Sequence, residues 1–591
     1  MSGLASFFSP TGSASSSQPI TPAPLRPHEY PFTAAERGSV IILFGGLTWK
    51  HERLITALLS GSGYLCQRLP ETDRTAHEIG KEFCSSGLCN PVYFTVGSLI
   101  RFLEEKHREG IARDRIVERY VYFTAACGGP CRFGMYETEF RTALNAAGYE
   151  GFRVLSFSQD RGIRAETGHT GLQFSVDFGM HALQSFVLGD LLNIVERRIR
   201  PFENSPGTAT RAVAAAADRI GQQIEHGENF EFGNCLPGWL RPQEHSFWYR
   251  IPNTLGKLVF HLRGIPMQPA LAEAAAEFNS LEVDWLRPKP VVKIIGEFWA
   301  QMTESDGNFR MLDFLEKEGV EVSIEPISTW LLYLLYQRKE QARYRLTIDA
   351  HEAPWSHPVK ALKARATKRA SMLAFELGTK IYLRYFYKLA RMLKVSNCSL
   401  PPQPLLAELA SPYFNTRLRG GEGHLEVGKT LYYQRRQKIC HLVLALKPFG
   451  CLPSVQSDAV QAALVERFPE VNFLSVETSA DGAIHAYSRV QMALAEARTK
   501  TETEFELTLG KVRHSLAEIR AYVALHRELR DPLLRIPPHP GIISTASNFL
   551  LYADETMSAN MSELAGANAR QNTRGNTTRL ESIESPQEMK S

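Results

Sequence analysis

The sequence predicts an α/β protein with two Rossmann-like parallel-sheet lobes, helical connecting segments and disordered termini. A unit of strand, turn, helix and strand can be read four times along the chain. The strands of these units are continuous apolar runs, which is typical of parallel sheets covered by helices on both faces. The length of 591 residues is too great for one ordinary core, so more than one lobe is expected.

The first lobe is expected at residues 38–171, after a disordered arm. Residues 1–37 are rich in Ser, Pro, Thr and Ala, so they cannot bury enough apolar surface to become ordered. The first unit of the lobe runs from SVIILFGG through WKHERLITALLSG to YLCQRL, and the second from ERYVYFTAACGG through MYETEFRTALNAAG to FRVLSFS. Both are predicted to be βαβ units, which close right-handed.

The second lobe is expected at residues 286–540, after a mainly helical connector at 172–285. The connector carries apolar residues at helical spacing in LQSFVLGDLLNIVERRI and TRAVAAAADRIGQQIEH. In the lobe, PVVKIIGEF leads to FRMLDFLEKEG and VEVSI, and HLVLALKPFG leads to SDAVQAALVERF and VNFLSVE. Helical patterns at 358–394 and 486–530 are expected as insertions. The polar stretch 541–591 is expected to be a flexible tail.

The composition excludes several broad classes of protein. A net charge of +4 is small for this length and gives no argument for nucleic acid or a membrane surface as partner. The longest apolar run, WLLYLLY at 330–336, is too short for a membrane helix, and the N-terminus has no secretory signal pattern. A cytoplasmic protein is therefore expected.

The cysteines are the main candidates for chemistry. Nine cysteines without an export signal argue against a disulfide framework and leave metal binding, catalysis or plain burial. Cys127, Cys131 and Cys451 follow predicted strands in Gly/Pro turns, at the sheet edge where ligands bind in open α/β sheets. Cys84 and Cys89 lie in a further loop, CSSGLCNPVY. Three loops that each offer a thiolate are what a metal cluster between domains needs; structural cysteines remain the alternative.

Other motifs carry less weight. Residues 423–430, GHLEVGKT, match the phosphate-loop pattern and would use Gly428, Lys429 and Thr430. No buried strand precedes them, and Glu426 would put a carboxylate in the anion cradle, so we interpret the match as chance. The spacings CxxxxC and CxxxC differ from the tight CxxC of structural zinc sites. Neither GxSxG nor HExxH occurs.

At the same residues the chain resembles the 2-hydroxyacyl-CoA dehydratase superfamily, specifically the acyl-CoA dehydratase activase-related proteins. The resemblance covers roughly residues 38–530 and is strongest in GGLTWKHE, KEFCSSGLCNPVYFTVG, GGPCRFGMYETEFR, LGDLLNIVERRIRPFE, LKPFGCLPSVQSD and VETSADGAIHAYSRVQMALAEA. It implies a 4Fe-4S cluster held between Rossmann-like domains by Cys89, Cys131 and Cys451. Cys127 is an alternate or fourth ligand under this resemblance, and Cys84 a more distant candidate. It identifies no catalytic side chain and no particular substrate.

The resemblance also implies a reaction and partners. In related 2-hydroxyglutaryl-CoA dehydratases, a separate ATP-dependent iron-sulfur activase supplies one low-potential electron, and a bound acyl-CoA is reduced and loses its hydroxyl. Related branches, such as the benzoyl-CoA reductases, instead reduce an aromatic ring. Such a chain is a lyase or an ATP-coupled oxidoreductase component, acting with a second dehydratase-like subunit or as a homodimer. A non-catalytic electron-transfer or scaffold subunit and a double-cubane reductase remain alternatives, and so does an ATPase that uses Lys429.

Basic segments offer two further interpretations. The segment 197–203, RRIRPFE, and the basic start of the 358–394 helix, with Lys360, Lys363, Arg365, Lys368 and Arg369, are suited to CoA phosphates or to the activase. Structural salt bridges and a solvated helix face explain them equally well.

Overall fold

A computed structural model describes residues 29–158, 171–173, 175–227, 229–235, 246–352, 358–395, 398–418 and 420–561. These residues form two four-stranded parallel sheets, which confirms the predicted α/β class. The first sheet comprises β1 (Ile41–Phe44), β2 (Leu65–Arg68), β3 (Tyr120–Ala126) and β4 (Arg153–Ser158), in the order β2-β1-β3-β4. Its helices are α1 (Trp49–Gly61), α2 (Arg74–Phe83), α3 (Pro91–Arg108), α4 (Arg113–Arg119) and α5 (Tyr136–Ala146), with 3₁₀ turns η1 (Ala34–Glu36) and η2 (Arg132–Met135).

The second sheet has the same strand order. It comprises β5 (Val291–Gly296), β6 (Glu321–Ile324), β7 (Leu442–Pro448) and β8 (Phe473–Thr478), in the order β6-β5-β7-β8. Every residue of β5 and β7 is buried, as expected for central strands of a sheet covered on both faces. The helices of this lobe are α10 (Phe298–Met302), α11 (Met311–Lys317), α12 (Ile327–Glu352), α13 (Pro358–Met392), α14 (Gln403–Ala410), α15 (Leu425–Leu431), α16 (Leu452–Arg467), α17 (Ala483–Leu509) and α18 (Leu516–Leu525).

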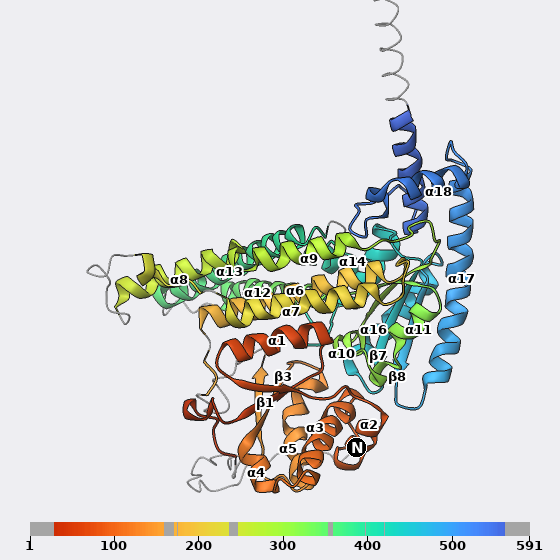
Figure 1. Ribbon diagram of the computed structural model, residues 1–591. Helices are drawn as coiled ribbons and strands as arrows, with labels where there is room; N and C mark the ends of the chain where they lie inside the picture. The colour runs from red at the N-terminus through yellow and green to blue at the C-terminus, as the bar shows by residue number, and fades with distance from the viewer. Residues whose placement is uncertain are drawn as a thin grey trace, which may run out of the picture.

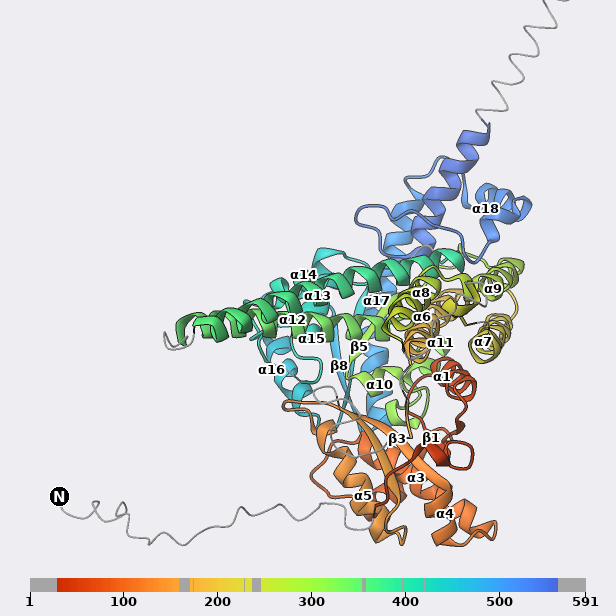
Figure 2. The ribbon, with the colours of Figure 1, turned by 90° about the vertical axis from the view of Figure 1, so that its left-hand side faces the viewer.

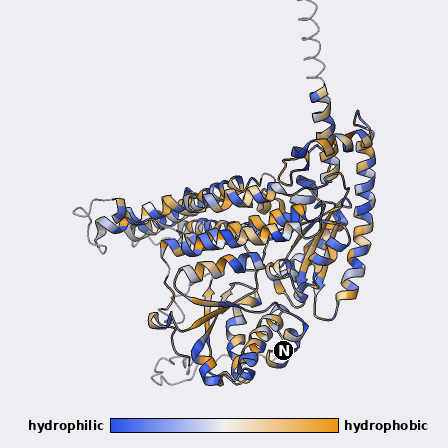
Figure 3. Cartoon of the chain, in the orientation of Figure 1, coloured by the Kyte–Doolittle hydropathy of each residue, from blue (hydrophilic) through white to orange (hydrophobic). Residues whose placement is uncertain are grey.

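A helical layer packs on both lobes (Figure 1). It contains α6 (Val176–Ile199), α7 (Thr208–His226), α8 (Phe247–Leu262) and α9 (Gln268–Ser280), and α1 of the first lobe packs on α6 and α7. Most residues of α6 are buried on every side, so this helix forms the centre of the largest apolar core. The pair α12 and α13 runs side by side and extends beyond the rest of the molecule (Figure 2). Apolar residues line the strands and alternate with polar ones along the helices (Figure 3).

Both termini differ from the expected boundaries. The predicted disordered arm 1–37 is wrong for residues 29–37, because Phe32 is buried in a small core and Glu36 pairs with Arg153 at 2.7 Å; residues 1–28 lie outside the described part. The predicted tail 541–591 is wrong for residues 545–561, which are helical. Ala546, Phe549, Leu550 and Ala553 of this helix recur at i, i+3, i+4 and i+7 and are fully buried in the main core.

One helix among the described residues, α6, is long and apolar enough to cross a membrane by length and composition alone. Two-thirds of its most apolar window, 67%, is buried inside the protein. Such burial is typical of the core helix of a soluble protein, and the contacts of α6 with both lobes account for its composition.

Candidate functional site

The two sheets bring their ligand-binding edges together. In each sheet the strand order reverses between its first and third strands, β1 and β3 or β5 and β7, and open α/β sheets bind ligands at the carboxyl ends of such strands. Cys127 follows β3, Glu297 follows β5 and Cys451 follows β7 by three residues. The two edges face each other, because a Cβ added to Gly46, after β1, would lie 3.5 Å from Trp299 of α10.

The loop that carries Cys89 is tied to both sheet edges. The Asn90 amide donates to the Phe449 carbonyl at 2.9 Å, which joins the loop to the end of β7. The Arg132 guanidinium donates to the Gly87 carbonyl at 2.7 Å, which joins it to the turn after β3. The thiol of Cys89 is buried and lies 2.9 Å from the Tyr136 hydroxyl.

Glycine allows the closest approach of these loops. Gly450 has a φ of 77°, in the left-handed region. A Cβ at this position would lie 3.4 Å from the Cα of Cys89 and 3.5 Å from Nη1 of Arg132. The sequence motif FGC therefore places Cys451 directly beside the Cys89 loop.

A fourth segment, 420–422, completes the site. The Gly421 amide donates to Cys127 Sγ at 3.4 Å, although the two residues are 294 positions apart. A Cβ added to Gly420 would lie 2.2 Å from the Gly128 carbonyl oxygen. A Cβ added to Gly421 would lie 2.6 Å from Pro453. The segment is thus wedged between the turn after β3 and the start of α16.

The phosphate-loop match, residues 423–430, follows directly after segment 420–422. No strand precedes Gly423 in the described residues 398–418 and 420–422, which agrees with the interpretation that the match is fortuitous. Residues 425–431 form the short helix α15, and Lys429 within it is buried. Residues 420–422, just before the match, lie beside the thiol-bearing loops instead.

Two carboxyl groups lie in the same site, and the sequence analysis missed both. Glu297 accepts a hydrogen bond from the Ala300 amide at 2.8 Å, and Glu422 accepts one from the Phe298 amide at 3.0 Å. Burial raises the pKa of Glu297 to about 7, and the charge of Cys127 adds to the rise. Burial and the neighbouring charge of Glu297 raise the pKa of Glu422 to about 8.

The thiols are held largely in their protonated form. Burial, with the charge of Glu297 as a further cause, raises the pKa of Cys89 to about 11. Burial and the charges of Glu297 and Glu422 raise the pKa of Cys451 strongly. The hydrogen bond between Cys127 and Cys131 raises the pKa of Cys131 and lowers that of Cys127, because one sulfur donates and the other accepts. Ligation of a metal at these thiols would therefore release protons.

The predicted ligands do not all share this environment. Cys89, Cys127, Cys131 and Cys451 are each influenced by Glu297 or Glu422. Cys84 is different, because burial and the charge of Glu139 raise its pKa to about 12, and Glu139 is bound by the Ser85 hydroxyl at 3.0 Å. Four of the five candidate cysteines thus have Glu297 or Glu422 as an acidic neighbour, whereas Cys84 has Glu139, although both Cys84 and Cys89 act on Tyr93.

Thiols are the main candidate metal donors of this site. The described residues contain no group of three or more His, Cys, Asp or Glu side chains that could hold one metal ion. A four-iron cluster binds each thiolate through a different iron, so its ligands lie further apart than those of one ion. Cys89 and Cys451 are buried and Cys127 and Cys131 are partly exposed, and thiolates on separate loops are donors of the type that such a cluster takes.

The basic segments have different environments. Arg197 is buried and pairs with Glu304 at 2.8 Å and with Glu316, and Arg200 pairs with Glu316 at 2.5 Å. These arginines therefore act in structural salt bridges, one of the two interpretations of segment 197–203. Lys363 and Arg369 of α13 are exposed, whereas the side chain of Lys360 lies outside the described residues.

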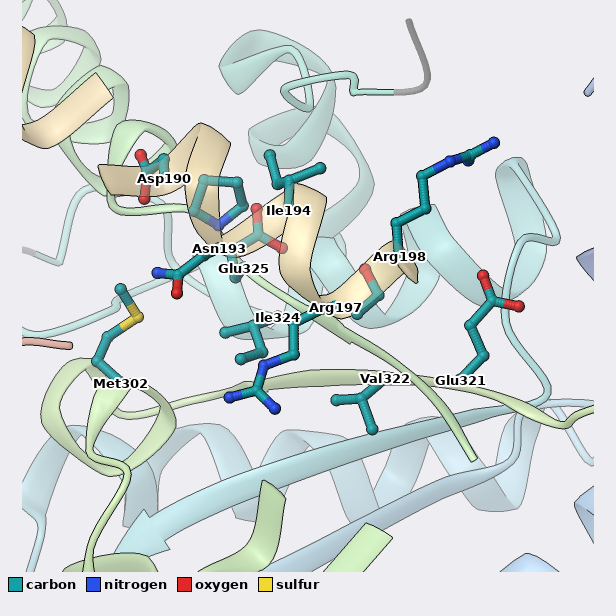
Figure 4. A pocket seen from close by; sticks show the side chains of 12 residues that line it. Asp190, Asn193, Ile194, Arg197, Arg198, Met302, Glu321, Val322, Ile324 and Glu325 are labelled. Atoms are coloured by element: carbon teal, nitrogen blue, oxygen red, sulfur yellow. The ribbon is translucent and has the colours of Figure 1, made fainter. Parts of the chain in front are cut away.

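A separate polar cavity of about 130 Å³ lies between α6 and β6 (Figure 4). Its lining includes Asn193 and Arg197 from α6, Glu321 at the start of β6 and Glu325 directly after the end of β6. Each of these four side chains has a buried polar atom without a hydrogen-bond partner. The cavity is large enough for several water molecules and includes none of the cysteines.

A comparison with models of protein families finds no match, and a search of curated proteins finds no similar sequence.

Proposed function

We propose that this chain is the iron-sulfur component of an ATP-driven 2-hydroxyacyl-CoA dehydratase or related reductase. It would accept low-potential electrons from a separate iron-sulfur activase and act in the cytoplasm on an acyl-CoA. The observation that carries the proposal is the interlocking of the Cys89, Cys131 and Cys451 loops at the facing carboxyl ends of two parallel sheets. The shared strand order supports a Rossmann-like assignment for both lobes.

Cys89, Cys131 and Cys451 would hold a 4Fe-4S cluster, with Cys127 as the candidate fourth or alternate ligand. With three thiolates bound, such a cluster supplies one-electron chemistry and one iron open to a substrate oxygen. The chain's own groups have distinct tasks. The Gly421 amide stabilises negative charge on Cys127, and the Tyr136 hydroxyl does so on Cys89. Burial of Cys89 and Cys451 excludes water from the sulfur atoms.

The test is anaerobic purification followed by iron and sulfide analysis and electron paramagnetic resonance (EPR) spectroscopy after reduction with dithionite. We expect about four irons and four sulfides per chain. The variants Cys89→Ala, Cys131→Ala and Cys451→Ala should each lose most of the iron. Cys235→Ala is the matched control, because Cys235 is exposed and lies outside the site. Iron at background level in the wild-type chain would refute the proposal.

The same preparation distinguishes the second candidate, a non-catalytic electron-transfer or scaffold subunit. A cluster that is reduced by activase and ATP but turns over no acyl-CoA would favour that role, and about eight irons per chain would favour a double cubane. Nucleotide binding that is lost in Lys429→Ala would favour an ATPase instead.

A further inference from the structure

Two carboxyl groups from distant parts of the second lobe meet at the start of α10. Glu297 leaves the end of β5 and binds the Ala300 amide, while Glu422 comes from the segment wedged between the thiol loops and binds the Phe298 amide. The two carboxyl groups therefore accept hydrogen bonds from the backbone amides of the first and third residues of α10. Their side chains come close enough for each to act on the other's charge.

No cation neutralises this pair within the described residues. Glu422 is 8% exposed, and neither it nor Glu297 forms an ion pair there. The nearest buried acids do have partners, since Glu426 pairs with Lys447 at 2.5 Å and Glu325 with Lys293 at 3.2 Å. Burying two unpaired carboxylates side by side is costly, so the pair retains a proton at neutral pH.

The groups that act electrostatically on the pair come from every surrounding element. They are mostly anionic or neutral: Cys89, Cys127, Cys131, Cys451, Tyr136, Tyr333, Glu426 and the cation Lys429. Lys429 is also influenced by Glu325 and Lys293, so it is not dedicated to the pair. Arg132 acts on Cys89 in the same site and is held by the Gly87 carbonyl, and neither it nor Lys429 forms an ion pair with Glu297 or Glu422 in the described residues. A proton is therefore the simplest countercharge for an added electron.

We propose that Glu297 and Glu422 form a proton-accepting pair that takes up one proton when the neighbouring thiol-bound site receives one electron. This inference rests on the proposed function, because it needs an iron-sulfur cluster to receive the electron. One electron enters from a low-potential one-electron donor, and one proton from water forms an O–H bond on the ionised carboxylate of the pair. The net charge of the site is then unchanged, which removes the electrostatic cost of reduction in a poorly solvated environment.

The main experiment is a potentiometric titration monitored by EPR, at pH values from 6 to 10, on the cluster-loaded protein. We expect the midpoint potential to be flat while the pair is fully protonated and then to fall by about 59 mV for each tenfold drop in proton concentration. The fall should begin near pH 7 to 8, where the pair starts to ionise.

Glu297→Gln, Glu422→Gln and the double variant should reduce or abolish this slope while the EPR signal is kept. Glu477→Gln is the matched control, since Glu477 is exposed near the end of β8 in the same sheet, and it should retain the slope. A flat potential in the wild type, or an unchanged slope in the double variant, would overturn the proposal.

An infrared measurement on the metal-free protein separates this proposal from the proposed function. A protonated carboxyl component that belongs to the pair should be present at pH 7, as the difference between the bands of the wild type and the Glu297→Gln/Glu422→Gln variant, and should persist in Glu477→Gln. The difference is needed because burial also raises the pKa of Glu52 to about 7. Absence of this component from the wild type would overturn the shared proton even if the cluster binds. Its presence in a chain that binds no iron would uphold the protonated pair and refute its coupling to a cluster, together with the proposed function.

Discussion

Replacing Lys50 by Met should weaken the junction between the two lobes. Lys50 belongs to α1 of the first lobe and is completely buried. Its ammonium lies 2.5 Å from Glu196 of α6 and 3.2 Å from Glu304 of the second lobe. Met keeps the length and apolar stem of the side chain and removes only the charge, so Lys50→Met tests the ion pair rather than the packing.

The expected cost follows from what remains around Glu196. This carboxylate is 1% exposed and would keep the Thr210 hydroxyl at 2.9 Å, the Arg200 guanidinium at 3.8 Å and the charge of Arg197, which already pairs with Glu304 and Glu316. Removing one partner of a buried ion pair typically costs about 3–5 kcal/mol, because the other charge stays buried and unpaired. Lys50→Met/Glu196→Gln removes both charges and should recover at least half of that loss.

Hydrogen exchange of the amides of α1 and α6 measures this cost without assuming that both lobes unfold together. A loss of about 3–5 kcal/mol in opening free energy corresponds to exchange faster by about 100- to 5,000-fold, since about 1.4 kcal/mol is a factor of ten. Acceleration of less than about fivefold, or a double variant as unstable as Lys50→Met, would refute the reasoning.

Three further predictions follow from single positions. Gly421→Ala should lose more than half of the bound iron, because its Cβ would lie 2.6 Å from Pro453, whereas Gly541→Ala, with a similarly positive φ and open space, should keep it; equal iron contents would contradict this expectation. Phe549→Ala should lower the free energy of unfolding by about 3–5 kcal/mol, measured by urea denaturation, and a change below about 1 kcal/mol would show that the C-terminal helix is not part of the core. The raised pKa of Glu422 means that the folded state binds more protons than the unfolded chain between pH 4.5 and about 8, so stability should fall as the pH rises through this window. The fall should be on the order of 5 kcal/mol, since a pKa change of one corresponds to about 1.4 kcal/mol, and thermal melting of Glu422→Gln should show a smaller fall.

The sheets and their connecting helices were predictable because their signals are local. Continuous apolar runs such as those of β5 and β7 are recognisable within a few residues, and each is followed by a turn and a helix. The C-terminal helix was missed although Ala546, Phe549, Leu550 and Ala553 have a helical period. Ser547 and Asn548 separate the first two of these residues, and Thr545 and Asp554 flank the set, so a composition-based reading gives the segment too little weight.

The candidate site was predictable only in part, for a related reason. The turns that carry Cys127, Cys131 and Cys451 directly follow strands, so the parallel topology alone brings them to sheet edges. Glu422 and Gly421 reach the same site from a segment 294 positions from Cys127, and no local pattern reports so distant a contact. The Gly-Gly pair at 420–421 is a signal that the sequence does contain, because glycine allows a positive φ and a close approach of two backbones. Both glycines have a positive φ in the structure.

Hydrogen bonds of the chain itself hold the Cys89 loop against the second lobe, and this affects how strongly the thiols would hold a metal. Asn90 donates to the Phe449 carbonyl at 2.9 Å and to the Thr478 carbonyl at 3.3 Å, while His77 lies 2.9 Å from the amide oxygen of Asn90. These contacts join the first lobe to the ends of β7 and β8. The conformational entropy of aligning Cys89 with Cys451 is therefore lost during folding and not during metal binding. The remaining cost of ligation is the release of thiol protons from buried sulfur atoms, so metal affinity at this site should depend more on pH than on movement of the lobes.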